Sequence, residues 1–158
     1  GFVGRRDARP SDAADRRHAG YLEALAAAGI PADPALTAQV DAFTAEEGER
    51  VAGAMAATIP DLDGIVCSND SVALGALAAL QAQGRSVPGD VAVVGIDDIR
   101  AARFAVPALS TIAPDHARLV DAAFTELERQ IAAPPGADLP VRHVTVGARL
   151  IPRASTAR

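Results

Sequence analysis

The sequence predicts an α/β fold in which a mostly parallel sheet is flanked by helices, giving three layers of helix, sheet and helix. Short apolar runs that suit buried strands alternate along the chain with longer amphipathic stretches that suit helices. Strand, helix and strand at this spacing form right-handed crossovers between parallel strands. Apolar residues make up 49% and charged residues 22% of the 158 residues, the balance of a globular domain with a sizeable core.

The predicted strands are short runs rich in apolar and β-branched residues, at 1–4, 37–43, 62–69, 90–96 and 141–147. Among them the run 37–43 has the weakest pattern. Val91, Val93 and Val94 make the run at 90–96 a strand that is buried on both faces. We expect the stretch that follows it, ending VPALSTI at residue 112, to be irregular.

The predicted helices carry an apolar face and recognisable ends, and they cover residues 11–30, 44–59, 70–84 and 115–133. Tyr21, Leu22 and Leu25 share one face of the first helix. Thr44 opens the second helix, and Glu47 three residues later completes a capping-box pattern. A low-complexity linker at 134–140 follows the last helix.

Composition excludes several classes of function. The formal net charge of −5 argues against this segment binding a phosphate backbone by itself. The single cysteine, Cys67, allows no disulfide framework and no multi-cysteine zinc site, which favours a reducing compartment. Apolar stretches end well short of 18 residues, and GFVGRRDARP lacks the apolar region of a signal peptide. We therefore expect no membrane segment, no metal and no cofactor.

Catalytic patterns are missing as well. The chain contains no Lys, which a receiver-type phosphoacceptor site needs beside its acidic residues. It has neither a G-x-G-x-x-G turn nor a G-x-S-x-G elbow. Cys67 lies in an apolar strand, as a small core residue does. His18, His116 and His143 are scattered and form no metal-ligand pair. The sequence therefore predicts no catalytic residues, and the protein is not expected to be an enzyme.

Polar residues gather where two predicted strands end. Asn69 and Asp70 follow one strand, and Asp97 and Asp98 follow another. Ligands of open parallel sheets collect beyond the carboxyl ends of the strands. Sugars and nucleosides are bound there by carboxylates, amides, guanidinium groups and aromatic faces. The candidate ligand-binding residues that supply this set are Arg17, Phe43, Asn69 and Asp97.

Each candidate also has a structural interpretation. Asn69 or Asp70 suits the N-cap of the helix that follows. Phe43 suits a core position, and Arg17 suits a solvated helix face beside Arg16. The sequence alone leaves these alternatives open, and the set of residues is more informative than any one of them.

Residues 68–99, SNDSVALGALAALQAQGRSVPGDVAVVGIDDI, closely resemble the signature of the lactose/galactose repressor family of bacterial transcription factors. In that family a strand, an Asn-Asp pair, a helix beginning ALGAL, a Val-Pro turn and a VVG strand with paired Asp residues occur in this order. Further agreement extends over nearly the whole chain, in RRHAGYLEALAAAGI (16–30), FTAEEG (43–48), VPALSTIAPD (106–115) and RLIPRAST (149–156). The ordered motif is highly specific.

The resemblance implies an effector module similar to type I periplasmic sugar-binding proteins, in which two Rossmann-like subdomains clamp a ligand. Residues 1–112 then form the C-terminal effector subdomain. Residues 113–135 form a crossing helix that belongs to the N-terminal subdomain, and 136–158 form a return strand and tail. We expect the helix-turn-helix headpiece and the N-terminal subdomain to be absent from this chain. The apolar face of the crossing helix then needs another cover, such as a second chain.

The resemblance also implies a function: the effector-binding and dimerising portion of a cytoplasmic transcriptional repressor. A small sugar-like or nucleoside-like effector would control a homodimer that binds operator DNA through the missing headpiece, not through this segment. Arg17, Phe43, Asn69 and Asp97 match the family's effector contacts, whereas Asp70 and Asp98 are expected to cap backbone N–H groups at the next helix. We expect this segment alone to bind effector weakly or not at all. The alternative is a type I periplasmic sugar-binding protein of a transporter.

Overall fold

A six-stranded sheet with the strand order β2-β1-β3-β4-β5-β6 organises the chain. The computed structural model describes residues 1–4, 13–134 and 136–157. Five strands are parallel, and β6 runs antiparallel to β5. The strands are β1 (Phe2–Gly4), β2 (Thr37–Gln39), β3 (Gly64–Cys67), β4 (Ala92–Ile96), β5 (Ser110–Pro114) and β6 (Ala148–Ile151). The predicted mostly parallel α/β architecture is confirmed.

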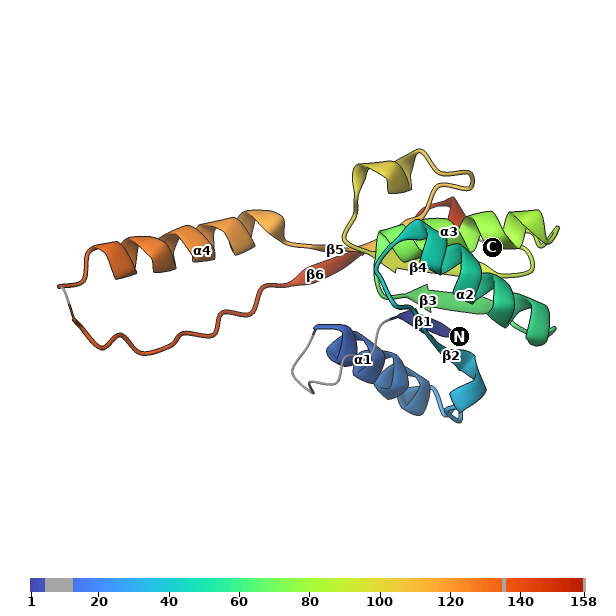
Figure 1. Ribbon diagram of the computed structural model, residues 1–158, viewed down its shortest axis with the longest axis horizontal. Helices are drawn as coiled ribbons and strands as arrows, with labels where there is room; N and C mark the ends of the chain where they lie inside the picture. The colour runs from blue at the N-terminus through green and yellow to red at the C-terminus, as the bar shows by residue number, and fades with distance from the viewer. Residues whose placement is uncertain (5–12, 135, 158) are drawn as a thin grey trace.

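The helices are α1 (Ala13–Ala27), α2 (Ala45–Thr58), α3 (Asp70–Ala82) and α4 (His116–Ile131), with short 3-10 turns η1 (Pro34–Leu36), η2 (Arg100–Arg103) and η3 (Ala154–Thr156). Helix α1 covers one face of the sheet and α2 and α3 cover the other, whereas α4 lies away from the sheet (Figure 1). Neighbouring residues of β1 define the faces. The Phe2 ring contacts the rings of His18 and Tyr21 on α1, whereas Val3 lies in the core beneath α2 and α3. The three-layer prediction is confirmed.

Glycines set the distance between α2 and α3 above the core. A Cβ atom on Gly75 would lie 1.9 Å from the Ala45 carbonyl oxygen, and one on Gly48 would lie 2.1 Å from the Val72 carbonyl oxygen. Neither position accepts a side chain unless a helix moves, because both obstacles are backbone atoms. The close helix pair packs on β3 and β4, whose buried side chains share one core with it.

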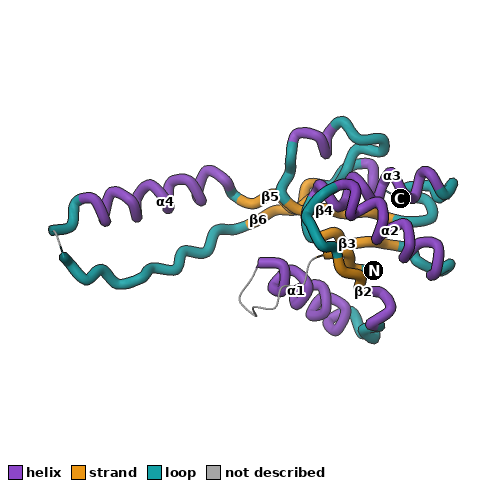
Figure 2. The backbone as a smooth tube through the Cα atoms, in the orientation of Figure 1, coloured by secondary structure: helices purple, strands orange, loops and turns teal. Residues whose placement is uncertain are grey.

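An arm leaves the body of the molecule along β5 and β6 (Figure 1). It consists of α4 and an extended return segment that Figure 2 shows as loop. No residue of α4 is buried, and its apolar side chains are exposed: Leu119, Val120, Phe124, Leu127 and Ile131. Among the described residues, no helix combines the length and the apolar character that crossing a membrane requires.

The structure corrects two strand predictions. Residues 141–147 form no strand, and the last strand is β6, beginning at Ala148. Residues 110–112, expected to be irregular, belong to β5. The run at 141–147 is β-prone in composition but lies on the arm without a neighbouring strand, whereas residues 148–151 pair with β5 despite their exposure. Strand pairing decided the outcome, because β propensity mostly measures packing against neighbours.

Candidate ligand-binding site

Arg17 connects the ends of two strands. It lies on α1, where its Nη1 donates a hydrogen bond to the carbonyl oxygen of Ser68 after β3, at 2.8 Å. Its Nη2 lies 3.6 Å from Oδ1 of Asp97, which follows β4. The structure thus brings Arg17 and Asp97 together, as expected for residues near the carboxyl edge of a parallel sheet. The guanidinium of Arg17 and the carboxylate of Asp97 therefore lie together at this edge of the sheet.

Asp97 is half-buried and held in an unusual backbone conformation. Its φ is +114°, and its N–H donates to the carbonyl oxygen of Ile112 at 2.9 Å. Burial raises the pKa of the Asp97 carboxyl above its usual value, and the nearby Arg17 guanidinium and His116 imidazole act in the opposite direction. With 36% of its side chain exposed beside Arg17, Asp97 remains accessible to a hydroxyl donor.

Asn69 caps a helix. Its Oδ1 accepts a hydrogen bond from the N–H of Val72 at 2.8 Å, which makes it the N-cap of α3. The capping interpretation of Asn69 is therefore confirmed. The cap uses one lone pair of the amide oxygen and leaves the Nδ2 donor for a ligand.

Phe43 lies in the loop between β2 and α2, beyond the strand end at Gln39. It is 37% exposed, so the interpretation as a plain core residue is wrong. Its ring stacks on no other ring in the part of the chain that the structure describes. A half-exposed aromatic face of this kind suits stacking on the apolar face of a sugar or base.

Asp70 has a different role from the one predicted. Its carboxylate is fully buried, and Oδ1 accepts a hydrogen bond from the Thr111 hydroxyl at 2.6 Å. Oδ2 accepts from the N–H of Ile99 at 2.9 Å, so Asp70 supports the loop after β4 instead of capping the next helix. The reason is that Asn69 takes the cap position. A Cβ atom on Gly95 would lie 2.2 Å from Asp70 Oδ1, so the glycine leaves room for the carboxylate.

Asp98 was also expected to cap backbone, and this is wrong. The 3-10 turn η2 that follows has no side-chain cap. The Asp98 carboxylate instead accepts a hydrogen bond from Nη2 of Arg153 at 2.5 Å. Arg153 and Thr111 were missed as supporting residues. The only sequence signal for Arg153 was the RLIPRAST segment, which carries the resemblance without indicating a contact.

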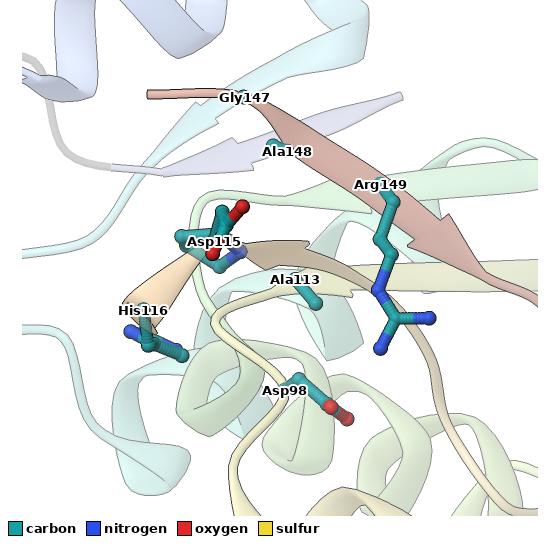
Figure 3. Close-up of a pocket in the computed structure, with 8 residues that line it drawn as sticks. Asp98, Ala113, Asp115, His116, Gly147, Ala148 and Arg149 are labelled. Carbon is teal, nitrogen blue, oxygen red and sulfur yellow. The ribbon is translucent and has the colours of Figure 1, made fainter. Parts of the chain in front are cut away.

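An open cavity of about 490 Å³ lies at the base of the arm, next to this loop. Figure 3 shows Asp98 and Arg149 reaching it from opposite sides, with Asp115 and His116 at the start of α4. His116 Nε2 lies 3.4 Å from the carbonyl oxygen of Asp97, so a residue that lines the cavity contacts the backbone of Asp97. Within residues 1–4, 13–134 and 136–157, no three His, Cys, Asp or Glu side chains are placed to hold a metal ion.

Comparison with known sequences places this geometry in context. Residues 1–156 match the family described as periplasmic binding protein-like domain. The repressor PurR of Erwinia tasmaniensis is 37% identical over 117 residues, which are 74% of this chain and 34% of PurR. The regulator CelR of Thermobifida fusca is 41% identical over 93 residues, 59% of this chain and 27% of CelR. The chain thus spans about a third of the length of these curated relatives.

Solved structures agree. A LacI-family regulator from Sanguibacter keddieii superposes with a TM-score of 0.89 at 35% identity, over 98% of this chain and 57% of that protein. The CelR–cellobiose complex superposes with a TM-score of 0.75 at 31% identity, over 98% of this chain and 46% of CelR. These relatives are regulators, neither enzymes nor transporter components by name. The chain belongs to the periplasmic binding protein-like domain family, among the effector-binding domains of LacI-type transcriptional regulators.

Proposed function

We propose that this chain is the effector-binding part of a cytoplasmic transcriptional repressor, and that a small sugar-like ligand binds beside Arg17 and Asp97. The observation that carries the proposal is the half-exposed pair of guanidinium and carboxylate at the carboxyl edge of the sheet. Asp97 accepts hydrogen bonds from ligand hydroxyls, and Arg17 donates to ligand oxygens. The cellobiose in the CelR complex supports a sugar as the ligand class.

Two further side chains complete the proposed contacts. Nδ2 of Asn69 donates to a ligand hydroxyl, since the helix cap uses only the amide oxygen. Phe43 stacks on the ligand ring. The cavity at the base of the arm extends the site toward His116, whose imidazole faces the Asp97 backbone.

Control of DNA binding follows from the arm. In this proposal α4, within residues 113–135, belongs to a neighbouring subdomain of the same polypeptide, which covers its apolar face. A ligand that contacts both subdomains favours one relative orientation over the other. A headpiece outside this chain binds the operator DNA. The ligand can change the affinity for DNA only to the extent that it binds one of the two orientations more tightly than the other.

A homodimer is part of the proposal. Phe104 is 72% exposed and Val106 is 83% exposed, both on the segment between η2 and β5. Large apolar side chains exposed together are typical of an interface. We expect Phe104→Ser combined with Val106→Ser to convert the full-length dimer to a monomer in sedimentation velocity, and Ala101→Ser to leave it unchanged. A dimer that persists in the double variant would contradict this interface.

Titration calorimetry of the full-length protein tests the ligand site. The probes are glucose, cellobiose, sucrose and adenosine, which separate a sugar from a nucleoside effector. For the probe that binds, Asp97→Asn and Arg17→Gln should each raise Kd by about tenfold or more, because each removes a charge-assisted hydrogen bond. Arg103→Gln, an exposed arginine on η2, serves as the matched control. Unchanged Kd values in both site variants would overturn the proposed site.

A further inference from the structure

Arg153 joins the strand that returns from the arm to the loop that carries Asp97. It follows β6, and its side chain is largely buried, with 14% exposed. Nη1 donates to the carbonyl oxygen of Leu109 at 2.7 Å, just before β5. Nη2 donates to the carboxylate of Asp98, the residue next to Asp97. One guanidinium therefore holds both ends of the segment that connects β4 to β5.

The loop that Arg153 holds needs support. Asp97 and Asp98 have φ values of +114° and +53°, a region that L-residues other than Asn and Asp seldom adopt. Their backbone is fixed by hydrogen bonds from Asp98 N–H to Thr111 Oγ1 at 3.2 Å and from Ile99 N–H to Asp70 at 2.9 Å. In the part of the chain that the structure describes, only Arg153 bonds the side chain of Asp98.

The backbone around Arg153 is anchored independently of its side chain. Arg153 N–H donates to the Ser110 hydroxyl at 2.7 Å. Ser155 Oγ donates to the carbonyl oxygen of Val93 at 2.6 Å and accepts from the N–H of Ser110 at 2.8 Å. Removing the guanidinium therefore leaves the segment attached to β4 and β5. Substitutions of the Arg153 side chain are therefore expected to leave the fold intact.

We propose that Arg153 is a positioning residue of the ligand site, which fixes through Asp98 the loop that presents Asp97. The ligand part of this inference rests on the proposed function. Arg153 thereby becomes part of the binding machinery without lining the cavity at the base of the arm.

A double-mutant cycle in the full-length protein tests the action through Asp98, with cellobiose as the probe. Arg153→Gln and Asp98→Asn should each raise Kd by about tenfold, and the double variant should be no weaker than the weaker single variant. Arg153→Lys should recover part of the loss, because it keeps a charge near Asp98. Arg103→Gln is the control. A Kd for Arg153→Gln within about twofold of wild type, or losses that multiply to about a hundredfold, would overturn the proposal.

Amide hydrogen exchange supplies a measurement that needs no ligand. In Arg153→Gln the N–H groups of Asp98 and Ile99 should exchange faster, while those of Val93 and Val94 in β4 keep their wild-type rates. Unchanged exchange at Asp98 and Ile99 would overturn the positioning role. If wild type binds neither cellobiose nor the other probes, the proposed ligand class fails, and the exchange rates still decide whether Arg153 holds the loop.

Discussion

The buried carboxylate of Asp70 accepts a hydrogen bond of 2.6 Å from the hydroxyl of Thr111, which joins the start of α3 to β5 beneath the candidate site. Thr111→Val keeps the shape and removes the donor, leaving a buried oxygen without this partner. We expect a loss of about 1–3 kcal/mol in the free energy of unfolding by urea denaturation. Thr58→Val, at the exposed end of α2, should cost less than about 1 kcal/mol. Equal losses in the two variants would contradict a special role for Thr111.

Asp70 also predicts a pH dependence of stability. Burial raises its pKa in the folded protein, so the folded state binds more protons than the unfolded state between the unfolded and folded pKa values. The stabilisation from this group is therefore complete below about pH 4 and is lost as the pH rises through the folded pKa. The free energy of unfolding of wild type minus that of Asp70→Asn should fall across this range. A rise of this difference with pH would contradict the prediction, because it would mean that folding favours the ionised carboxyl of Asp70.

Gly75 gives the sharpest packing prediction. Because a methyl group there would meet the backbone of Ala45 at 1.9 Å, Gly75→Ala should force α2 and α3 apart and cost about 3 kcal/mol or more. Gly20→Ala is the matched control, since nothing lies within 4 Å of a Cβ atom at this position in α1. It should be neutral or stabilise by up to about 1 kcal/mol. Thermal unfolding of both variants checks the contrast, and a stable Gly75→Ala protein would contradict the close approach.

Local patterns made most of the fold predictable. Thr44 accepts from the N–H of Glu47 at 3.3 Å, as the capping pattern indicated, although the Glu47 carboxylate binds Asp41 N–H and Arg50 instead of returning to the cap. The four helices of the described residues were predicted because apolar periodicity and end signals lie within each segment. β5 and β6 were missed because their identity depends on pairing with strands distant in the sequence.

The candidate site was predictable to the same extent. The approach of Arg17 and Asp97 follows from topology, since residues near the carboxyl edge of a parallel sheet converge. The partners of Asp70 and Asp98 do not follow from it. Thr111 and Arg153 reach them across the fold, and neither lies at a spacing that a periodic pattern can reveal. Side-chain pairing between distant segments required the three-dimensional structure.

The exposed apolar face of α4 predicts that one substitution affects stability differently in the 158-residue chain and in the full-length protein. Phe124 is 61% exposed at the middle of this face, so Phe124→Ser in the 158-residue chain should change the free energy of unfolding by less than about 0.5 kcal/mol. In the full-length protein the proposed neighbouring subdomain covers the same ring, and the variant should cost about 3 kcal/mol or more. Asp121→Ser, on the exposed side of α4, should have little effect in either. Urea denaturation of wild type, Phe124→Ser and Asp121→Ser at each of the two lengths measures these changes. Equal small losses for Phe124→Ser at both lengths would contradict the assignment of α4 to a neighbouring subdomain.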